Sequence, residues 1–418
     1  MKAVITVKIR KLICLAAAML VFASCGVTKT SEPLPTVTLS VWCPFEETDI
    51  TSQMVSAFSE AHKDEASFNI TISVEGEQTC KETVLSSPEN AADVFFFAAD
   101  QFESLRRGGA LLPVTENTDE IVNENGGAES GSVLGASYDG TLYAYPETAS
   151  NSYFLYYNSA YYTGEDVRSF DRLLEIAEAN GKKVYMDFSS GWYIYSFFKG
   201  AGLSVELNDD GVTNSCDWNS RTAPIRGTDV AEAMLKIAAS SGFMSGSDED
   251  FKNGVEDGSI IAGVNGTWNS EKVAKAWGEN FAAACLPEYT VCGKQVQMHS
   301  FSGYKYAGVN AYTEEPHWAM ELARWLTNEE NQTLRFKARG EGPSNIKAAA
   351  SPEVQQAPAL AALCEQSAYG HIQNVADTFW TPTYVFGTVI IAGNSDNRDL
   401  QELLDEMTEG ITALPEEK

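Results

Sequence analysis

The chain has 418 residues, of which 44% are hydrophobic, 11% aromatic and 21% charged. These proportions exclude collagen-like repeats, a pure coiled coil and long disorder, and the length suits two or three folding units. The excess of 58 acidic over 29 basic residues, a net charge of −29, repels phosphate backbones, so we expect no nucleic-acid partner.

The N-terminus has the pattern of an export signal. Basic residues are followed by the apolar run Leu12–Ala23, which is shorter than the roughly 20 residues that span a bilayer. Small residues then lead into Cys25, as in a bacterial lipobox, although Phe22 stands where Leu or Val is usual. We expect residues 1–24 to be a lipoprotein signal peptide and Cys25 to be lipidated. An ordinary secretory cleavage beside an incidental cysteine is the alternative.

The segment that follows suits a flexible tether. Residues 25–35 are rich in Thr, Ser and Pro, and lipid chains on Cys25 would hold the protein stably on a membrane. No other apolar run approaches membrane length. We therefore expect the protein at the extracytoplasmic face of the bacterial cell membrane, in contact with it through the lipid anchor only. Whether the cell has one membrane or two stays open.

Six cysteines remain once the leader and the lipid site are set aside. They are Cys43, Cys80, Cys216, Cys285, Cys292 and Cys364. Export permits disulfides, and Cys285 with Cys292 could pair across a turn, but six buried thiols fit equally well. No Cys or His spacing is typical of zinc, so we expect no metal and no cofactor.

Strands and helices alternate from the start of the predicted mature chain. Alternating strands are predicted at 37–42 and 68–74 with a helix between them, and a continuous apolar strand at 93–97. Such alternation within about seventy residues is typical of a parallel α/β sheet. Short strands at 143–146 and 153–157, on either side of a proline-containing stretch, predict a crossover between two lobes.

The same alternation continues beyond the crossover. The predicted elements are a helix at 170–179, a strand at 183–188, an aromatic stretch at 192–198, a helix at 229–241, strands at 259–265 and 306–310, and helices at 317–326 and 400–414.

Motifs for nucleotide binding and hydrolysis are missing from the sequence. It contains no GxxxxGK[ST], no complete GxGxxG and no GxSxG. A glycosidase needs two carboxylates about 5 to 9.5 Å apart, and 58 acidic residues leave room for such a pair. We expect no enzymatic activity, and a surface glycosidase or an adhesion module is a minor alternative.

Three tryptophans stand where α/β proteins bind ligands. Trp268 follows the apolar strand at 260–264, Trp192 comes just after another strand, and Trp380 lies in a turn-like aromatic segment. Ligands of open α/β sheets lie beyond the carboxyl ends of strands, and apolar sugar faces stack on aromatic rings. Each tryptophan taken singly could be a core residue, but the three together favour a carbohydrate-binding cleft.

Four stretches carry a resemblance to a known family. They are residues 93–113, with Asp-x-Phe and Gly-Gly-Ala-Leu-Leu-Pro after a strand, 257–268 (Asp-Gly-Ser-Ile-Ile-Ala-Gly-Val-Asn-Gly-Thr-Trp), 303–326 and 374–391. Over about residues 37–412 the chain resembles the family 1 extracellular solute-binding proteins of ABC transporters, and most closely the maltose/maltodextrin-binding proteins.

The resemblance implies a two-lobed α/β fold with hinge crossovers, the type II periplasmic-binding-protein or Venus-flytrap fold. The implied N-terminal lobe comprises residues 36–147 and 304–345, and the implied C-terminal lobe comprises residues 148–303 and 346–418.

The resemblance also implies ligand-binding positions. Trp268 and Trp380 match two stacking tryptophans, and Trp192 falls where the family has a stacking tyrosine. Asp100 matches a carboxylate that binds sugar hydroxyls, and Glu46 falls near another. The positions that depart from the family are Phe97 (for Trp), Glu47 (for Lys), Gln101 (for Arg), Asn151 and Ser190 (each for Glu) and Tyr384 (for Arg). The aromatic stacking positions are kept while the polar positions around them change. This favours an oligosaccharide but puts maltose itself in doubt.

The implied function is that of a monomeric substrate-binding lipoprotein of an ABC importer. It would capture an oligosaccharide, maltodextrin-like or related, between its lobes and deliver it to the transmembrane subunits of the permease. The alternative keeps the fold but binds a peptide, polyamine or anion. The missing basic residues at positions 47 and 101 count against an anion. The sequence leaves open the sugar, its linkage and length, and the permease.

Overall fold

The computed structural model describes residues 34–208 and 210–415. The predicted signal peptide, Cys25 and most of the predicted tether lie outside these residues. In the described ranges, no helix has both the length and the apolar composition needed to cross a membrane.

A ten-stranded sheet runs through the described part of the chain, in the order β10-β7-β11-β6-β15-β3-β1-β2, with β12 paired to β6 and β16 to β15. Its strands are β1 (Thr36–Cys43), β2 (Ser67–Val74), β3 (Val94–Ala98), β6 (Ala144–Asn158), β7 (Lys183–Tyr185), β10 (Phe243–Met244), β11 (Ile260–Gly266), β12 (Phe281–Ala284), β15 (Ser300–Val309) and β16 (Gly370–Ile372). Three separate hairpin-like pairs are β4 (Ser137–Tyr138) with β5 (Thr141–Leu142), β8 (Val205–Leu207) with β9 (Asn214–Cys216), and β13 (Glu288–Val291) with β14 (Lys294–Gln297).

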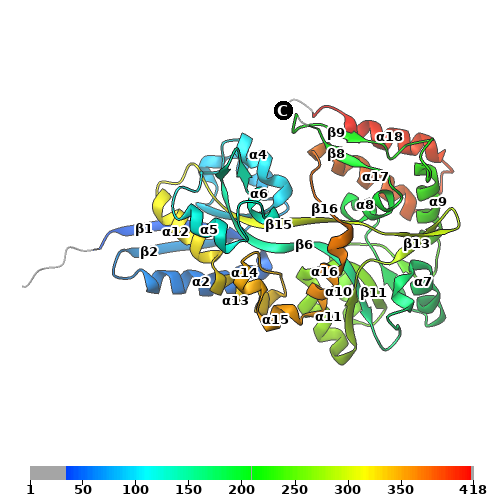
Figure 1. The fold of residues 1–418 in the computed structure, drawn as a ribbon, viewed down its shortest axis with the longest axis horizontal. Helices are drawn as coiled ribbons and strands as arrows, with labels where there is room; N and C mark the ends of the chain where they lie inside the picture. The colour runs from blue at the N-terminus through cyan, green and yellow to red at the C-terminus, as the bar shows by residue number, and fades with distance from the viewer. Residues whose placement is uncertain (1–33, 209, 416–418) are drawn as a thin grey trace, which may run out of the picture.

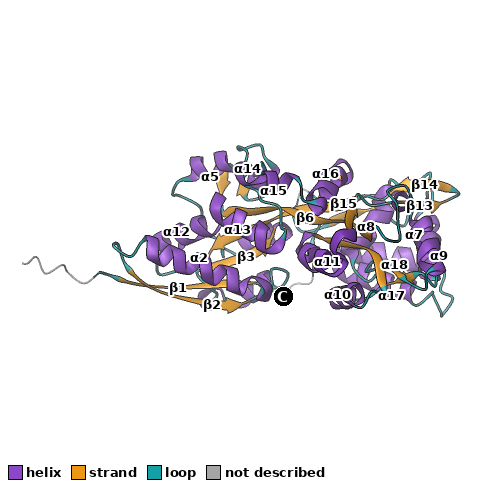
Figure 2. Ribbon diagram, turned by 90° about the horizontal axis from the view of Figure 1, so that it is seen from below, coloured by secondary structure: helices purple, strands orange, loops and turns teal. Residues whose placement is uncertain are grey.

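Helices surround the strands in both halves of the molecule (Figure 2). They are α2 (Thr48–Ala61), α3 (Cys80–Ser86), α4 (Phe102–Arg107), α5 (Thr118–Glu124), α6 (Gly131–Leu134), α7 (Phe170–Ala179), α8 (Gly191–Gly200), α9 (Gly227–Ala238), α10 (Asp248–Glu256), α11 (Ser270–Trp277), α12 (Pro316–Leu326), α13 (Glu329–Arg339), α14 (Ile346–Ala349), α15 (Pro352–Gln355), α16 (Pro358–Gln366), α17 (Trp380–Ile391) and α18 (Leu400–Thr412). The short 3-10 turns used below are η1 (Phe45–Glu47), η3 (Ala99–Gln101), η5 (Thr267–Asn269) and η8 (Asp377–Phe379).

Two long strands connect the halves. Strands β6 and β15 run side by side across the molecule in Figure 1 and pair antiparallel. The first part of β6 lies in the sheet with β15, β3, β1 and β2, and its second part pairs with β11 and β12. Any motion of one half against the other must therefore bend these two strands.

The halves have separate apolar cores. One core takes its buried residues from 37–145 and 306–326, and we call this half the N-terminal lobe. The main core of the other half takes them from 153–301 and 375–411, and we call that half the C-terminal lobe. A smaller cluster, including Tyr156 and Trp277, packs α11 and α16 against the C-terminal lobe. The cores change over within β6, between Tyr145 and Tyr153.

Alternation correctly predicted the first strand. In β1 the side chains of Val37, Leu39, Val41 and Cys43 are buried, and the residues between them are half-buried or exposed. Strand β1 is parallel to both β2 and β3, as the sequence pattern predicts.

The crossover differs from its prediction. Residues 144–158 form one strand of 15 residues where two short strands were expected. Pro146 pairs with Tyr306 where the register of β15 shifts. A proline has no N–H to give to a ladder, and such an irregularity accommodates it without breaking the strand.

Two aromatic segments are helical. Residues 192–198 lie within α8, and Trp380 begins α17, where a turn was expected. Pro382 does not prevent this helix because it occupies the first turn, in which the N–H groups have no partner within the helix. The six cysteines at positions 43–364 are all free thiols, so Cys285 and Cys292 are not bridged.

Candidate functional site

Trp192 and Trp380 lie at the two ends of a row of aromatic rings on the C-terminal lobe. The Trp192 ring is centred 5.5 Å from that of Phe301, which is 6.0 Å from Phe379, which in turn is 4.9 Å from Trp380. Phe301 and Phe379 are buried, whereas both tryptophans are half-buried. The core thus holds the two indoles in place and leaves part of each open to a ligand.

Trp268 lies at the end of the neighbouring strand. Its turn, η5, directly follows β11, whose last residue, Gly266, pairs with Tyr153. Tyr153 also contacts Trp192, with ring centres 5.5 Å apart. The Trp268 ring covers Gly266 so closely that a Cβ atom there would lie 2.0 Å from it. The ring is half-buried and covers the residue that pairs with Tyr153.

The N-terminal lobe contributes a carboxyl group. Asp100 is half-buried in η3, where β3 ends. Burial raises the pKa of this carboxyl to about 6, while its own backbone N–H and the nearby Lys81 ammonium act in the opposite direction. A carboxyl of this kind can accept hydrogen bonds from ligand hydroxyls.

An ion pair joins the two lobes beside these residues. Lys81 Nζ of α3 lies 2.7 Å from Asp377 Oδ1 of η8, the turn that leads into Trp380. Burial by itself would lower the pKa of Lys81, but the hydrogen bond and charge of Asp377 raise it. Near the same edge of the lobes, Arg107 Nη2 donates to the backbone oxygen of Asp210 at 3.1 Å. The two lobes are therefore in contact close to the segments that carry Asp100 and Trp380.

The remaining half-buried candidates lie close to the crossover and to α8. Asn151 is at the middle of β6, where it pairs with Gly303 of β15. Ser190 is the N-cap residue of α8, two positions before Trp192. Both are thus near the row of aromatic rings.

Three predicted ligand contacts have a different role in the structure. Phe97 is fully buried in the N-terminal core, because the strand that carries it is covered on both faces. Gln101, 3% exposed, points back into its own lobe, where its amide donates to the backbone oxygens of Glu77 and Gln78 and accepts from the N–H of Lys81. Glu47, 1% exposed, is ion-paired inside the lobe.

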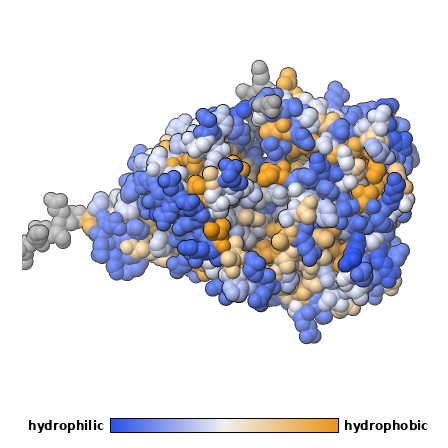
Figure 3. Space-filling view, in the orientation of Figure 1, coloured by the Kyte–Doolittle hydropathy of each residue, from blue (hydrophilic) through white to orange (hydrophobic). Residues whose placement is uncertain are grey.

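Glu46 and Tyr384 lie on the surface. Glu46 is exposed on η1, and Tyr384 is 57% exposed on α17, four residues beyond Trp380. Hydrophobic side chains are more frequent on the C-terminal lobe and at the junction of the lobes than on the N-terminal lobe, whose visible face is mostly hydrophilic (Figure 3).

The sequence did not predict a buried charge cluster that involves both connecting strands. Arg335 Nε lies 3.0 Å from Glu47 Oε2, and its Nη2 lies 2.9 Å from Glu147 Oε1. Lys305 Nζ lies 2.8 Å from Glu77 and 3.0 Å from Glu341. These residues belong to η1, α13, β6, β15 and two loops, so the cluster ties the connecting strands to the N-terminal lobe. A lysine within the apolar sequence of β15 was the one available signal of buried partners.

The pKa values in this cluster are set by burial and by the two cations. Burial raises the pKa of Glu77 to about 7, against the pull of Lys305. Burial likewise raises the pKa of Glu147 well above its usual value. Burial alone would also raise the pKa of Glu47, but the Arg335 guanidinium lowers it below its usual value. Four carboxyls thus lie around two cations, and burial favours the protonated forms of Glu77 and Glu147.

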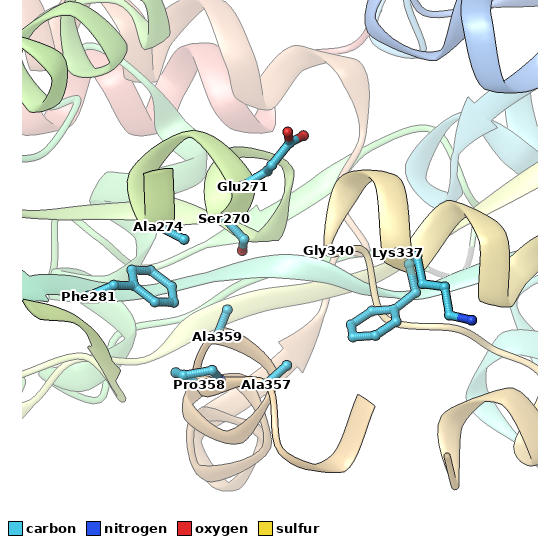
Figure 4. A pocket seen from close by; sticks show the side chains of 10 residues that line it. Ser270, Glu271, Ala274, Phe281, Lys337, Gly340, Ala357, Pro358 and Ala359 are labelled. Atoms are coloured by element: carbon cyan, nitrogen blue, oxygen red, sulfur yellow. The ribbon is translucent and has the colours of Figure 1, made fainter. Parts of the chain in front are cut away.

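The structure also has an apolar pocket of about 240 Å³ away from these residues. It lies between α11, α13 and α16, and its lining includes Ala274, Phe281 and Ala359. Phe281 is directed into it, while Glu271 and Lys337 extend away (Figure 4). Figure 1 places these helices on the side of β6 and β15 opposite to α4, β8 and β9. None of the predicted ligand-binding residues lines it.

Among residues 34–208 and 210–415, no three His, Cys, Asp or Glu side chains are grouped so that they could hold a metal ion.

Comparison with known proteins identifies relatives over nearly the full length. Residues 53–362 match the family described as bacterial extracellular solute-binding protein. The chain is 24% identical to the galactooligosaccharide-binding protein of Bacillus subtilis (strain 168), over 94% of this chain and 95% of the relative.

Two solved structures are similar over 90% of this chain and 99% of their own. One, described as being with acarbose, is 28% identical, with a TM-score of 0.80. The other, maltodextrin-binding protein MalE1 from L. casei BL23 without ligand, is 25% identical, with a TM-score of 0.74. These matches confirm the two-lobed α/β fold and the predicted family.

Proposed function

The chain belongs to the bacterial extracellular solute-binding proteins, and from this premise we propose that it is the substrate-binding lipoprotein of an ABC importer. It captures an oligosaccharide between its lobes and delivers it to the transmembrane subunits of the permease. The proposal rests on the half-buried tryptophans of one lobe and on the Lys81–Asp377 ion pair, which brings the segment leading into Trp380 against the lobe that carries Asp100.

The chemistry of these side chains suits a sugar. Indole rings offer flat apolar faces on which sugar rings stack, and their fixed orientation limits the entropy lost on binding. The half-buried carboxyl of Asp100 and the amide of Asn151 supply acceptors and donors for hydroxyl groups. Arginine side chains, which would suit an anionic ligand, are absent from this set of candidates.

The relatives support the class of ligand rather than one sugar. Their descriptions name galactooligosaccharide, acarbose and maltodextrin. The Lys and Arg expected at positions 47 and 101 of a maltose-binding protein are Glu and Gln here, and both side chains are buried. We therefore propose an oligosaccharide with a hydroxyl pattern different from that of maltose.

Binding would act through lobe closure without breaking a bond. A ligand that contacts both lobes stabilises the closed arrangement by its extra affinity for it, and so shifts the population. The closed form then docks on the permease. The family implies an extracytoplasmic location, and the proposed lipid anchor at Cys25 would keep the protein beside the permease, eleven residues before β1 begins at Thr36.

The test is a calorimetric titration of the mature chain, with Cys25 replaced by Ser, against galacto-, gluco-, manno- and xylo-oligosaccharides. Saturable binding with no change in the recovered sugar supports the proposal and identifies the sugar. Release of shorter sugars would instead make the protein an enzyme. A folded protein that binds no member of the panel would refute the oligosaccharide assignment. Metabolic labelling with a fatty acid, compared between wild type and Cys25→Ser, tests the anchor.

A further inference from the structure

The Lys81–Asp377 ion pair joins residues 296 positions apart in sequence and in different lobes. The Lys81 side chain is 12% exposed. Its ammonium also lies 3.3 Å from Glu82 on the same helix, and its charge acts on the carboxyl of Asp100. Lys81 thus has two acidic neighbours in its own lobe and one across the junction.

Both ends of this ion pair are held by buried amide side chains. On the N-terminal side, Gln101 accepts from the N–H of Lys81 at 3.0 Å and donates to the backbone oxygen of Glu77. On the C-terminal side, Asn214, 2% exposed, accepts from the N–H of Ala376 at 2.7 Å and donates to Thr378 Oγ1 at 3.2 Å. The segments on both sides of the junction are therefore fixed before the charges meet, which reduces the entropy lost when they pair.

The pair also lies between the candidate ligand contacts of the two lobes. Asp100 follows β3 on one side, and Trp380 follows Asp377 by three residues on the other. Bending at β6 and β15 that separates the lobes here would separate Lys81 from Asp377 while leaving Lys81 with Glu82 and Asp100. The closed molecule therefore has the Lys81–Asp377 ion pair, and the open molecule does not.

We propose that the Lys81–Asp377 ion pair is a cross-lobe latch that forms on closure, keeps part of the unliganded population closed, and adds to ligand affinity. Its effect on affinity rests on the proposed function, whereas its effect on closure does not. Because the latch is an ion pair, closure responds to salt even though a neutral sugar carries no charge.

The arrangement predicts unequal effects of the two partners. In Lys81→Met, the carboxylate of Asp377 faces those of Asp100 and Glu82 with no cation between them, so attraction becomes repulsion. In Asp377→Asn only the attraction is lost. The double variant Lys81→Met/Asp377→Asn should therefore be more closed than Lys81→Met alone. An ion pair that stabilised one lobe only would not affect the distance between the lobes.

The sugar-independent measurement is the radius of gyration from small-angle X-ray scattering of the unliganded mature chain with Cys25→Ser. We expect Lys81→Met to be the most expanded, the double variant to be more compact than it, and wild type to expand in 1 M NaCl. Arg221→Met is the matched control, because Arg221 pairs with Asp405 at 2.9 Å within the C-terminal lobe. Equal radii for wild type and Lys81→Met, or equal expansion of the control, would overturn the latch.

The second measurement is calorimetric affinity for the panel sugar that wild type binds. We expect about fivefold weaker binding for Asp377→Asn, which corresponds to about 1 kcal/mol, and a larger loss for Lys81→Met. Unchanged affinity in both variants would overturn the contribution to binding. If wild type binds no sugar but the scattering results hold, the proposed ligand class fails while the latch stands.

Discussion

Replacing Trp268 by alanine should weaken ligand binding while leaving the chain folded. The ring is half-buried over Gly266, so at most roughly a third of the 150–250 Å² that an indole can bury remains for a sugar face. At about 25 cal/mol per Å², the lost contact is worth about 1–2 kcal/mol, or roughly 5- to 30-fold in Kd. The free energy of unfolding should fall by less than for a fully buried tryptophan, because only part of the ring packs against the protein.

The assay is isothermal titration calorimetry, since a fluorescence titration would lose one of its own reporters. Trp277→Ala is the matched control. Trp277 is 7% exposed in the small cluster of the C-terminal lobe, so its loss should cost about 3–5 kcal/mol of stability and leave affinity unchanged. Unaltered affinity in Trp268→Ala together with weakened binding in Trp277→Ala would refute the position that we assign to the ligand.

Three further substitutions test the surroundings of the site. Gly266→Ala places a Cβ atom 2.0 Å from the Trp268 ring, so the indole must move and calorimetry should show an affinity loss similar to that of Trp268→Ala. Arg335→Met leaves the buried carboxyls of Glu47 and Glu147 without their cation, which should cost about 3–5 kcal/mol in urea unfolding at pH 7. That cost should shrink on acidification as the carboxyls are protonated, and a loss independent of pH would contradict the ion-pair explanation. Burial raises the pKa of Glu77 from 4.5 to about 7, so the folded state holds this proton more tightly than the unfolded chain. Stability of the wild type should therefore fall relative to Glu77→Gln as pH rises through this window, and parallel pH profiles in urea unfolding would argue against it.

Local sequence pattern determined much of the fold. Alternating apolar residues correctly predicted β1, because a strand with one buried face repeats every second residue. The helix expected at 317–326 is α12, with almost the same bounds. The tryptophans at strand ends could also be picked out, because the end of an apolar run marks the edge of a sheet.

The sequence predicted less well which side chains of the candidate site are buried. Phe97 was expected to be a ligand-facing ring, but its continuous apolar strand is covered on both faces, which buries it. Glu47 and Gln101 were expected at the ligand because they occupy positions that contact it in the resembling family. Their burial follows from partners elsewhere, Arg335 for the one and the backbone around Lys81 for the other.

The sequence by itself therefore determined the class of fold, the family and the aromatic character of the candidate site. Only the tertiary structure decided which charges meet. Glu47 pairs with Arg335 across 288 residues and Lys81 with Asp377 across 296. No periodicity connects such positions, because apolar patterns record which face of an element is buried. The pairing of two charges depends on how those elements pack together, and that is a property of the whole chain.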